Sequence, residues 1–336
     1  MPTITAKRQL FDVPLEPIAG SRFQPTGFPD LGPAEFKRPI TVDGRVTWRD
    51  ALLVESAQSM ANHLEAVGWD LATEQPVVTL AGLPYVRVIA ADDRRYLTSS
   101  RTEAHRLASA FVKQAKLDDK PMTEVIRERL GLRDDTPLAP REIAHAVFAL
   151  DPLCLIHGVF FAESAKVWPG QPKIARAVTG FIEAVDVERA LSGGVKHDDV
   201  RHGMAEGVEG TSKEGYGTIP FHRTEFTAAS ITAYFVIDLA QIASYGLPAP
   251  ATALLEAIAR WEIRSLLDGG LRLRTACDLV PLDGSIVDRS GEPLPALDQL
   301  DGEVRRLVGE CRDLVGTQHP LEVVWGGGKA RAAKAG

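Results

Sequence analysis

The sequence predicts an α+β fold in which a ferredoxin-like or RRM-like sheet carries large insertions. Strand patterns and helix patterns follow one another in the order strand, helix, hairpin, helix, strand. The chain has 336 residues, 45% hydrophobic and 25% charged, which is enough to bury at least one complete core. We expect one domain over residues 1–325, with a helical insertion at about 113–150, a second insertion or flexible tip at about 197–220, and a disordered tail at 326–336.

The first part of the chain predicts one strand and one helix. Residues 9–18 have the pattern of a first strand that ends in a glycine-rich loop. Between residues 55 and 67, apolar residues recur at helical spacing, and Gln58, Asn62 and Glu65 share the opposite face. This segment is therefore predicted to be a helix with one buried face and one polar face.

A hairpin and a further helix are expected next. Residues 84–90 and 94–98 have strand patterns and are separated by an Asp-Asp turn. Ser100 and Glu103 have the spacing of a capping box, which predicts a helix through Val112. The charged segment that follows is rich in helix formers and interrupted by prolines, and it is the predicted helical insertion.

The second half of the chain predicts a strand, two helices and a basic strand. Residues 231–239 alternate apolar and other residues and favour a strand, whereas 249–268 and 296–315 have helical patterns. If the segment around Arg272 and Arg274 is extended, both side chains share one face. They could bind phosphate or stack on bases, or they could pair with Asp268, Asp278 or a neighbouring subunit.

Three small loops rich in glycine or proline are expected at residues 20–32, 192–196 and 219–227. Glycine lets backbone N–H groups approach a phosphate closely, and arginine can bind phosphate through two parallel hydrogen bonds. The second loop lacks the spacing of a nucleotide-binding phosphate loop. The alternative for the first loop is an ordinary tight turn around a packed Phe23 or Phe28.

A metal site is one interpretation of the charged run that contains His197, Asp198, Asp199 and His202. No further ligand accompanies these residues, so the pattern favours a solvated charged loop and no metal site. No other motif of the sequence implies a cofactor or a small-molecule enzyme.

An acid–base ribonuclease is a second interpretation, carried by His222 and Arg223. Histidine titrates near neutral pH, and arginine can stabilise the charge of a phosphorane. One histidine without an evident second acid or base is thin support for this chemistry.

The formal net charge of −7 argues against a protein that coats nucleic acid through bulk positive charge, so any such contact must use local patches. No apolar run is long enough to cross a bilayer, and the first residues lack the apolar core of a signal peptide.

Cys154, Cys277 and Cys311 are widely spaced, which predicts buried thiols in a reducing cytoplasm.

Three further histidines are predicted to be structural. His105, His145 and His157 have apolar neighbours in the sequence and no ligand spacing. We therefore expect them to pack in the interior.

Several long strings of the sequence resemble one known family in order along roughly residues 8–282. That family is the RAMP-superfamily backbone subunit of type I-G (formerly type I-U) CRISPR Cascade complexes. The strings are RFQPTGFPDLG, LLVESAQSMANHLEAVGWD, GLPYVRV, LTSSRTEAHRL, LIHGVFFA, SGGVK, PFHRTEFTA, ITAYFVIDLAQIASYGL and GLRLRTACDL.

The resemblance implies an RRM-like palm with helical fingers and a hairpin thumb, in a protein that is not a nuclease. Copies would stack head to tail along a CRISPR RNA and hold it for pairing with target DNA, as in other RNA-guided systems. The other implied partners are the large subunit and the fused guide-processing subunit of the complex. The alternative function is a metal-independent ribonuclease that processes precursor CRISPR RNA.

Twelve residues are candidates for RNA contacts. They combine guanidinium, ammonium, amide, imidazole and hydroxyl groups with two glycines. They are Arg22, Gln24, Thr26, Gln58, Asn62, Gly193, Gly194, Lys196, His222, Arg223, Arg272 and Arg274.

Overall fold

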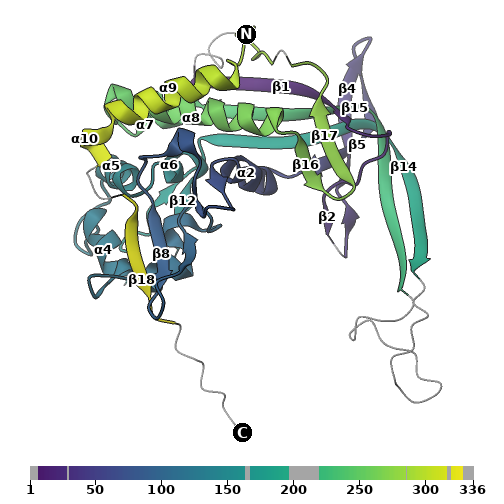
Figure 1. Cartoon of the computed structure of the whole chain (residues 1–336). Coiled ribbons are helices and arrows are strands. Elements are labelled where there is room, and N and C mark those ends of the chain that lie inside the picture. Colours follow the sequence, from purple (N-terminus) through teal and green to yellow (C-terminus); the bar gives the residue numbers. More distant parts are fainter. Residues whose placement is uncertain are drawn as a thin grey trace, which may run out of the picture.

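In the computed structural model, the chain folds around a seven-stranded antiparallel sheet and a smaller five-stranded sheet (Figure 1). The structure describes residues 7–28, 30–162, 167–196, 219–284, 286–315 and 319–327. Helices pack on these sheets, and the α+β class expected from the sequence is confirmed. No helix in these ranges is long and apolar enough to span a membrane.

The larger sheet is built from strands that are distant in the sequence. Its strand order is β16-β17-β1-β15-β14-β5-β4. The bounds in that order are Leu271–Arg274, Cys277–Pro281, Arg8–Pro17, Ile219–Asp238, Val178–Lys196, Arg45–Glu55 and Glu35–Val42. The strand expected at 9–18 is therefore β1, and β4 is one edge of the sheet.

Two helices pack on this sheet and against each other. They are α2 (Ala57–Ala66), which contacts β14, and α8 (Ala249–Asp268), which contacts β15. Both match the predicted helices. In chain order, β1, α2, β14, β15, α8 and β17 read strand, helix, strand, strand, helix, strand, and their four strands lie side by side as β17-β1-β15-β14.

The smaller sheet and several short helices lie in the chain mainly between α2 and β14. The five strands, in sheet order, are β11 (Lys120–Pro121), β10 (Lys116–Leu117), β18 (Leu321–Trp325), β8 (Val86–Ala90) and β9 (Tyr96–Ser99). The helices are α3 (Ala110–Gln114), α4 (Met122–Arg129), α5 (Pro140–Leu150) and α6 (Leu153–His157). The β8–β9 hairpin confirms the pattern at 84–98, and α4 and α5 lie in the segment predicted to be helical.

The remaining elements are α9 (Leu297–Glu310), which packs on α8, and several short helices and strand pairs. The other helices are α7 (Leu239–Ser244) and α10 (Arg312–Val315), together with 3-10 turns η1 (Val78–Leu80) and η2 (Arg106–Ala108). Three two-stranded pairs are β2 (Gly27–Phe28) with β3 (Gly32–Pro33), β6 (Trp69–Asp70) with β7 (Gln75–Pro76), and β12 (Val159–Phe160) with β13 (Lys173–Ile174). Buried apolar side chains from both sheets and the helices form one cluster.

The helix predicted from Ser100 through Val112 is wrong. The hydroxyl of Ser100 donates to Asp151 (2.5 Å) and accepts the backbone N–H of Val86 in β8. Both partners are buried, so this hydroxyl does not cap a helix. The cap belongs to Ser109, whose hydroxyl accepts the N–H of Val112 at the start of α3. A tertiary hydrogen bond therefore overrode the local spacing.

Two other boundaries differ from the predicted ones. The strand expected at 231–239 ends at Asp238, whose carboxylate accepts the N–H of Gln241 and caps α7. The helix expected at 296–315 is divided at Cys311 into α9 and α10.

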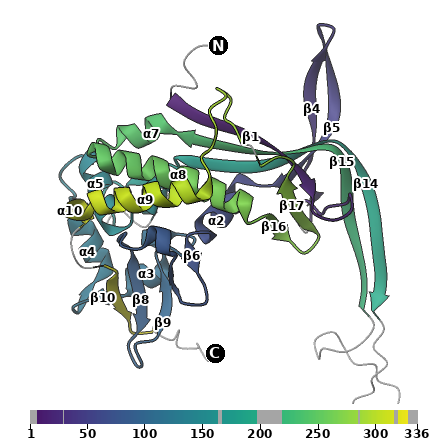
Figure 2. The same cartoon turned by 45° about the horizontal axis from the view of Figure 1, so that its top comes forward.

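The strands β14 and β15 are 19 and 20 residues long and extend beyond the sheet. Their inner halves belong to the sheet, with Ile182 and Phe235 buried. Their outer halves, residues 187–196 and 219–228, form a two-stranded ribbon that leaves the body of the protein (Figures 1 and 2). We call these residues the ribbon.

Candidate nucleic-acid interface

The loop between β1 and β4, residues 18–34, makes backbone hydrogen bonds to three other elements. We call it the fastened loop. Phe23 and Phe226 exchange two backbone hydrogen bonds of 2.9 and 2.8 Å, which join the loop to the base of the ribbon. The N–H of Gln24 donates to a carbonyl in the β16–β17 turn (2.7 Å), and that of Thr26 donates to a carbonyl in β5 (2.9 Å). Phe23 is buried, as the tight-turn interpretation expects. The same contacts hold Arg22, Gln24 and Thr26 at a fixed place beside the ribbon.

The side chain of Arg274, on β16, adds hydrogen bonds that hold the same loop. Its Nη1 donates to the carbonyls of Gln24 (2.8 Å) and Val54 (3.2 Å), and its Nη2 forms an ion pair with Glu55. The Glu55 side chain is only 1% exposed. A buried carboxylate is costly without a partner, so Arg274 is committed to holding the loop. Pairing with a carboxylate was one of the two alternatives for Arg274, but the expected partners Asp268 and Asp278 are wrong, because the partner is Glu55, which is distant in the sequence.

Arg272 has different surroundings from Arg274. The pairing of β16 with β17 shifts register between the two arginines, so simple strand alternation does not relate them. Arg272 is exposed, and its partner position in β17 is Asp278. The shared face predicted for this pair is therefore wrong, and Arg272 is the one that faces solvent.

Arg22 links the loop to the ribbon through a side chain. Its Nη1 lies 3.3 Å from Oε2 of Glu225, which also accepts a hydrogen bond from the hydroxyl of Ser192 (3.3 Å). Arg22 itself is exposed. Its guanidinium therefore lies at the base of the ribbon and can reach solvent.

The loops predicted at 192–196 and 219–227 are wrong, because both segments are paired strands of the ribbon. Gly193 lies opposite His222, and Arg223 lies opposite Ser192, while the backbone of Lys196 pairs with Ile219 at the outer end. Long cross-strand pairing has overridden the low strand propensity of glycine. The pairing brings Gly193, Gly194, His222 and Arg223 together on an exposed stretch.

The charged run 197–218 at the outer end of the ribbon lies outside the described residues, as does the metal interpretation of His197, Asp198, Asp199 and His202. Residues 328–336 of the predicted tail lie outside them too. Within the ranges that the structure describes, no group of three or more His, Cys, Asp or Glu side chains could hold a metal ion.

Gln58 and Asn62 occupy the exposed face of α2, as predicted, but Glu65, expected on the same polar face, is largely buried because it pairs with Arg106. Gln58 stands in the first turn of α2, three residues after Glu55. Among the described residues, no hydrogen bond or ion pair joins either amide to the loop or the ribbon. The structure therefore places Arg22, Gln24, Thr26 and Arg274 at the base of the ribbon and Gly193, Gly194, His222 and Arg223 farther along it, and leaves these two amides on the helix.

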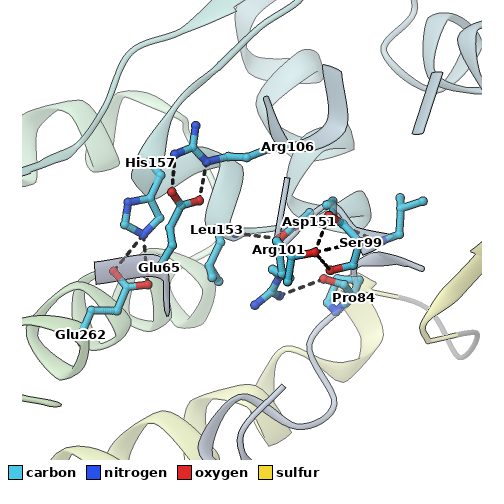
Figure 3. Close-up of polar contacts among 12 residues, drawn as sticks. Glu65, Pro84, Ser99, Arg101, Arg106, Asp151, Leu153, His157 and Glu262 are labelled. Atoms are coloured by element: carbon cyan, nitrogen blue, oxygen red, sulfur yellow. Dashed lines mark hydrogen bonds and ion pairs between the residues drawn. The ribbon is translucent and has the colours of Figure 1, made fainter. Parts of the chain in front are cut away.

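A second gathering of charged groups is buried between α2, α6 and α8 (Figure 3). Arg106 makes two hydrogen bonds of 2.6 Å to Glu65, and Nε2 of His157 lies 3.0 Å from Glu262. Burial lowers the pKa of His157, but the charges of Glu262 and Glu65 outweigh it, so this pKa lies above its ordinary value. Burial raises the pKa of Glu262. These groups pair with one another inside the core, although Nδ1 of His157 has no hydrogen-bond partner among the described residues.

The predicted structural role of the three histidines holds in part. His157 is fully buried but has the charged partner Glu262, and Nε2 of His145 lies 3.1 Å from the carbonyl of Gly246. His105 is exposed beside η2, so its expected burial is wrong.

The three cysteines behave as predicted from their spacing. Cys154, Cys277 and Cys311 are all buried and none forms a disulfide. Burial raises the pKa of Cys277 and of Cys311 to about 11, so both thiols stay protonated and unreactive near neutral pH.

Comparison with known proteins identifies the family. Residues 10–189 match the sequence family described as CRISPR-associated protein GSU0053. The chain belongs to this CRISPR-associated family. No curated protein matches the chain. Among solved structures, a chain titled "CRISPR RNA-guided surveillance complex, pre-nicking" matches with a TM-score of 0.36 and 12% identity, covering 82% of this chain and 73% of that one.

The matched range of this CRISPR-associated protein includes the fastened loop, β5, α2 and much of β14. Sequence reasoning missed the two carboxylates that organise this region, Glu55 and Glu225. Glu55 is 219 residues from Arg274 in the chain, and no local pattern connects them. The alternation of IPFHRTEFT could have indicated a strand, which would have placed Glu225 on one face with Arg223 and Phe221.

Proposed function

We propose that this CRISPR-associated protein is a non-catalytic backbone subunit that binds guide RNA in a type I-G Cascade complex. Copies would assemble head to tail along the RNA and present it for pairing with target DNA in antiviral defence, in the cytoplasm. The observation that carries the proposal is the family match over residues 10–189. The large subunit and the fused guide-processing subunit would complete the particle.

The order of elements supports an RRM-like palm. A strand-helix-strand-strand-helix-strand unit is the ferredoxin-like arrangement, and β1, α2, β14, β15, α8 and β17 have this order. Their strand order, β17-β1-β15-β14, places the first strand between the last and the third. We assign the helical segment at 113–150 to the fingers and the ribbon to the thumb.

The geometry at the base of the ribbon supports a contact with an RNA backbone. Arg22 is exposed at this base, and His222 and Arg223 are exposed farther along the ribbon, next to the backbone of Gly193 and Gly194. Guanidinium groups bind phosphate oxygens, and glycine lets a sugar-phosphate chain approach the strand closely. Each subunit supplies few such groups, so we expect affinity to accumulate through assembly of many copies on one guide.

The test is co-expression of the chain with a CRISPR array and the guide-processing subunit, followed by size-exclusion chromatography with light scattering. We expect a large particle with a high 260/280 nm absorbance ratio, discrete RNA and several copies of this chain. A nucleic-acid-free monomer would contradict the proposal.

The ribonuclease alternative is separated by a His222→Ala variant. In the proposed scaffold, purified chain leaves precursor CRISPR RNA intact with or without His222. If the wild-type chain cleaves the precursor and the variant does not, His222 is catalytic and the scaffold proposal is wrong. RNA binding is measured in parallel, because a variant that merely loses RNA would also lose cleavage.

A further inference from the structure

A second hairpin, formed by β4 and β5, projects from the edge of the large sheet and points away from the ribbon (Figures 1 and 2). Its strands pair from Glu35 with Leu52 to Val42 with Arg45, and residues 43 and 44 form the turn. From residue 41 to residue 50 every position is exposed. None of the twelve RNA-contact candidates lies on this hairpin.

One face of the hairpin presents an aromatic ring to solvent. Directly paired residues of an antiparallel hairpin share a face, and the pairs alternate between faces. Trp48 pairs with Pro39 and Val46 pairs with Thr41, so these four share one face. The Trp48 side chain is 63% exposed, whereas Trp69, Trp168 and Trp261 are buried and Trp325 is half-buried.

The apolar surface on that face is small. It ends at the next pair toward the sheet, where Lys37 donates to Asp50 (2.5 Å). A stable protein interface needs about 800 Å² on each partner. The exposed apolar groups of this face are Trp48, Val46 and Pro39, which are fewer than such an interface needs. A nucleobase needs only the face of one ring, so this face is better matched to a base than to a protein.

The opposite face of the hairpin is basic. It carries Arg38 directly paired with Arg49, and Arg45 next to the turn. Arg49 forms an ion pair with Asp186 of β14 at the foot of the hairpin, but within the described chain Arg45 has no ion-pair partner. The carboxylates of Glu35 and Asp50 are on the Trp48 face, and each already has a basic partner. Arg38 is half-buried, and its charge acts on Glu183 of β14, so Arg45 is the least compensated of the three arginines and favours an anionic ligand.

We infer that the β4–β5 hairpin is a separate binding site for single-stranded RNA, in which an unpaired base stacks on Trp48 and phosphates of the same strand contact Arg38 and Arg45. The inference rests on the proposed function for the class of ligand. It adds a site on a different element from the ribbon. A strand that crosses the hairpin places a base on one face and its sugar-phosphate chain over the other.

The exposure of Trp48 provides a direct readout in the full-length chain. Its fluorescence should be quenched when a uridine oligonucleotide, the probe, is titrated in, because stacking brings the indole and the base into contact. The variant Trp48→Phe keeps an aromatic face, so it should retain affinity but lose the quenching. The variant Trp48→Ser should lose affinity by about five- to 100-fold. Trp325→Phe is the matched control and should change neither quantity.

A second pair of variants tests the basic face. Arg45→Gln should weaken binding to all RNA sequences and reduce the slope of log affinity against log salt by about 1. Thr47→Ala, on the same face of the hairpin, should leave the slope unchanged. Unfolding midpoints of all variants are compared, because residues 45, 47 and 48 are exposed and their replacement should leave the fold intact.

The outcomes separate this inference from the proposed function. If the wild-type chain binds RNA and Trp48→Ser binds it equally well, the hairpin site is wrong and the proposed function stands. If the wild-type chain binds no RNA, with or without the other subunits, the proposed function fails and the inference fails with it. If Trp48→Ser lowers the mass of RNA-free particles by light scattering and leaves RNA affinity unchanged, the face is a contact between copies and the inference is overturned.

Discussion

Replacing Arg274 with methionine tests whether its pair with Glu55 holds the loop at the base of the ribbon. Methionine keeps much of the length of the side chain and removes the charge and all donors. The change leaves Glu55, which is 1% exposed, without a cationic partner. It also removes the donor to the carbonyls of Gln24 and Val54.

The size of the effect follows from burial. Removing one partner of a buried ion pair costs about 3–5 kcal/mol, because the remaining charge is desolvated and unpaired. Each hydrogen bond from a charged donor contributes about 1.5–3 kcal/mol, but all three contacts belong to one guanidinium and do not add. Arg274 is partly exposed, so we take the lower end and expect the free energy of unfolding to fall by about 3 kcal/mol.

Urea denaturation followed by circular dichroism measures this loss. The matched control is Arg272→Met on the same strand, which is exposed and should change stability by less than about 0.5 kcal/mol. The double variant Glu55→Gln with Arg274→Met should recover at least half of the loss, because no buried charge is left unpaired. Equal midpoints for Arg274→Met and Arg272→Met would refute the argument that Arg274 holds the loop.

Three further predictions concern the core. His157→Leu should destabilise the fold by about 3–5 kcal/mol in urea denaturation, and His157→Leu with Glu262→Leu by much less, because the double variant leaves no buried charge unpaired; equal losses would contradict this. The pKa of His157 is raised in the folded state, so its stabilisation is complete below the ordinary value of 6.5 and is lost as pH rises through the folded value. Stability measured from pH 6 upward should fall more steeply in the wild type than in the double variant, and parallel curves would contradict this assignment. Gly180→Ala should lower the thermal midpoint by an amount equivalent to about 1–3 kcal/mol, because an added Cβ would lie 2.8 Å from Met60 and Phe235; an unchanged midpoint would show that they move aside.

Local sequence patterns were sufficient to predict those helices and strands in which buried residues recur at a regular spacing. The apolar face of α2 and the alternation of Ile231 to Ile237 in β15 repeat over several turns or residue pairs, and both elements are present. The patterns failed where a distant partner decided the outcome. Ser100 looked like a helix cap but bonds to Asp151, and the glycines at 193 and 194 looked like a loop but pair with β15.

For the candidate site, the sequence predicted which side chains are exposed but not which of them lie together. The exposed positions of Arg22, Gln58 and Arg272 agree with their sequence patterns. The grouping of residues from the first loop, β16 and the ribbon was not predictable, because it depends on backbone bonds such as those between Phe23 and Phe226 across about two hundred residues. Tertiary contacts of this separation leave no periodic trace in the sequence.

An acidic chain can still present cations to RNA if its arginines differ in how firmly they are held. Arg189 donates to Glu35 at 2.9 and 2.8 Å, but the Glu35 side chain is 37% exposed, so water can solvate the carboxylate when the arginine turns away. Exposed pairs of this kind contribute little net stability, so a phosphate can replace the carboxylate at little cost. Glu55 has no such access to water, which keeps Arg274 in place. The exposure of the carboxylate partner, more than the count of basic residues, therefore separates arginines that are free to exchange their partner for a phosphate from arginines that hold the loop in place.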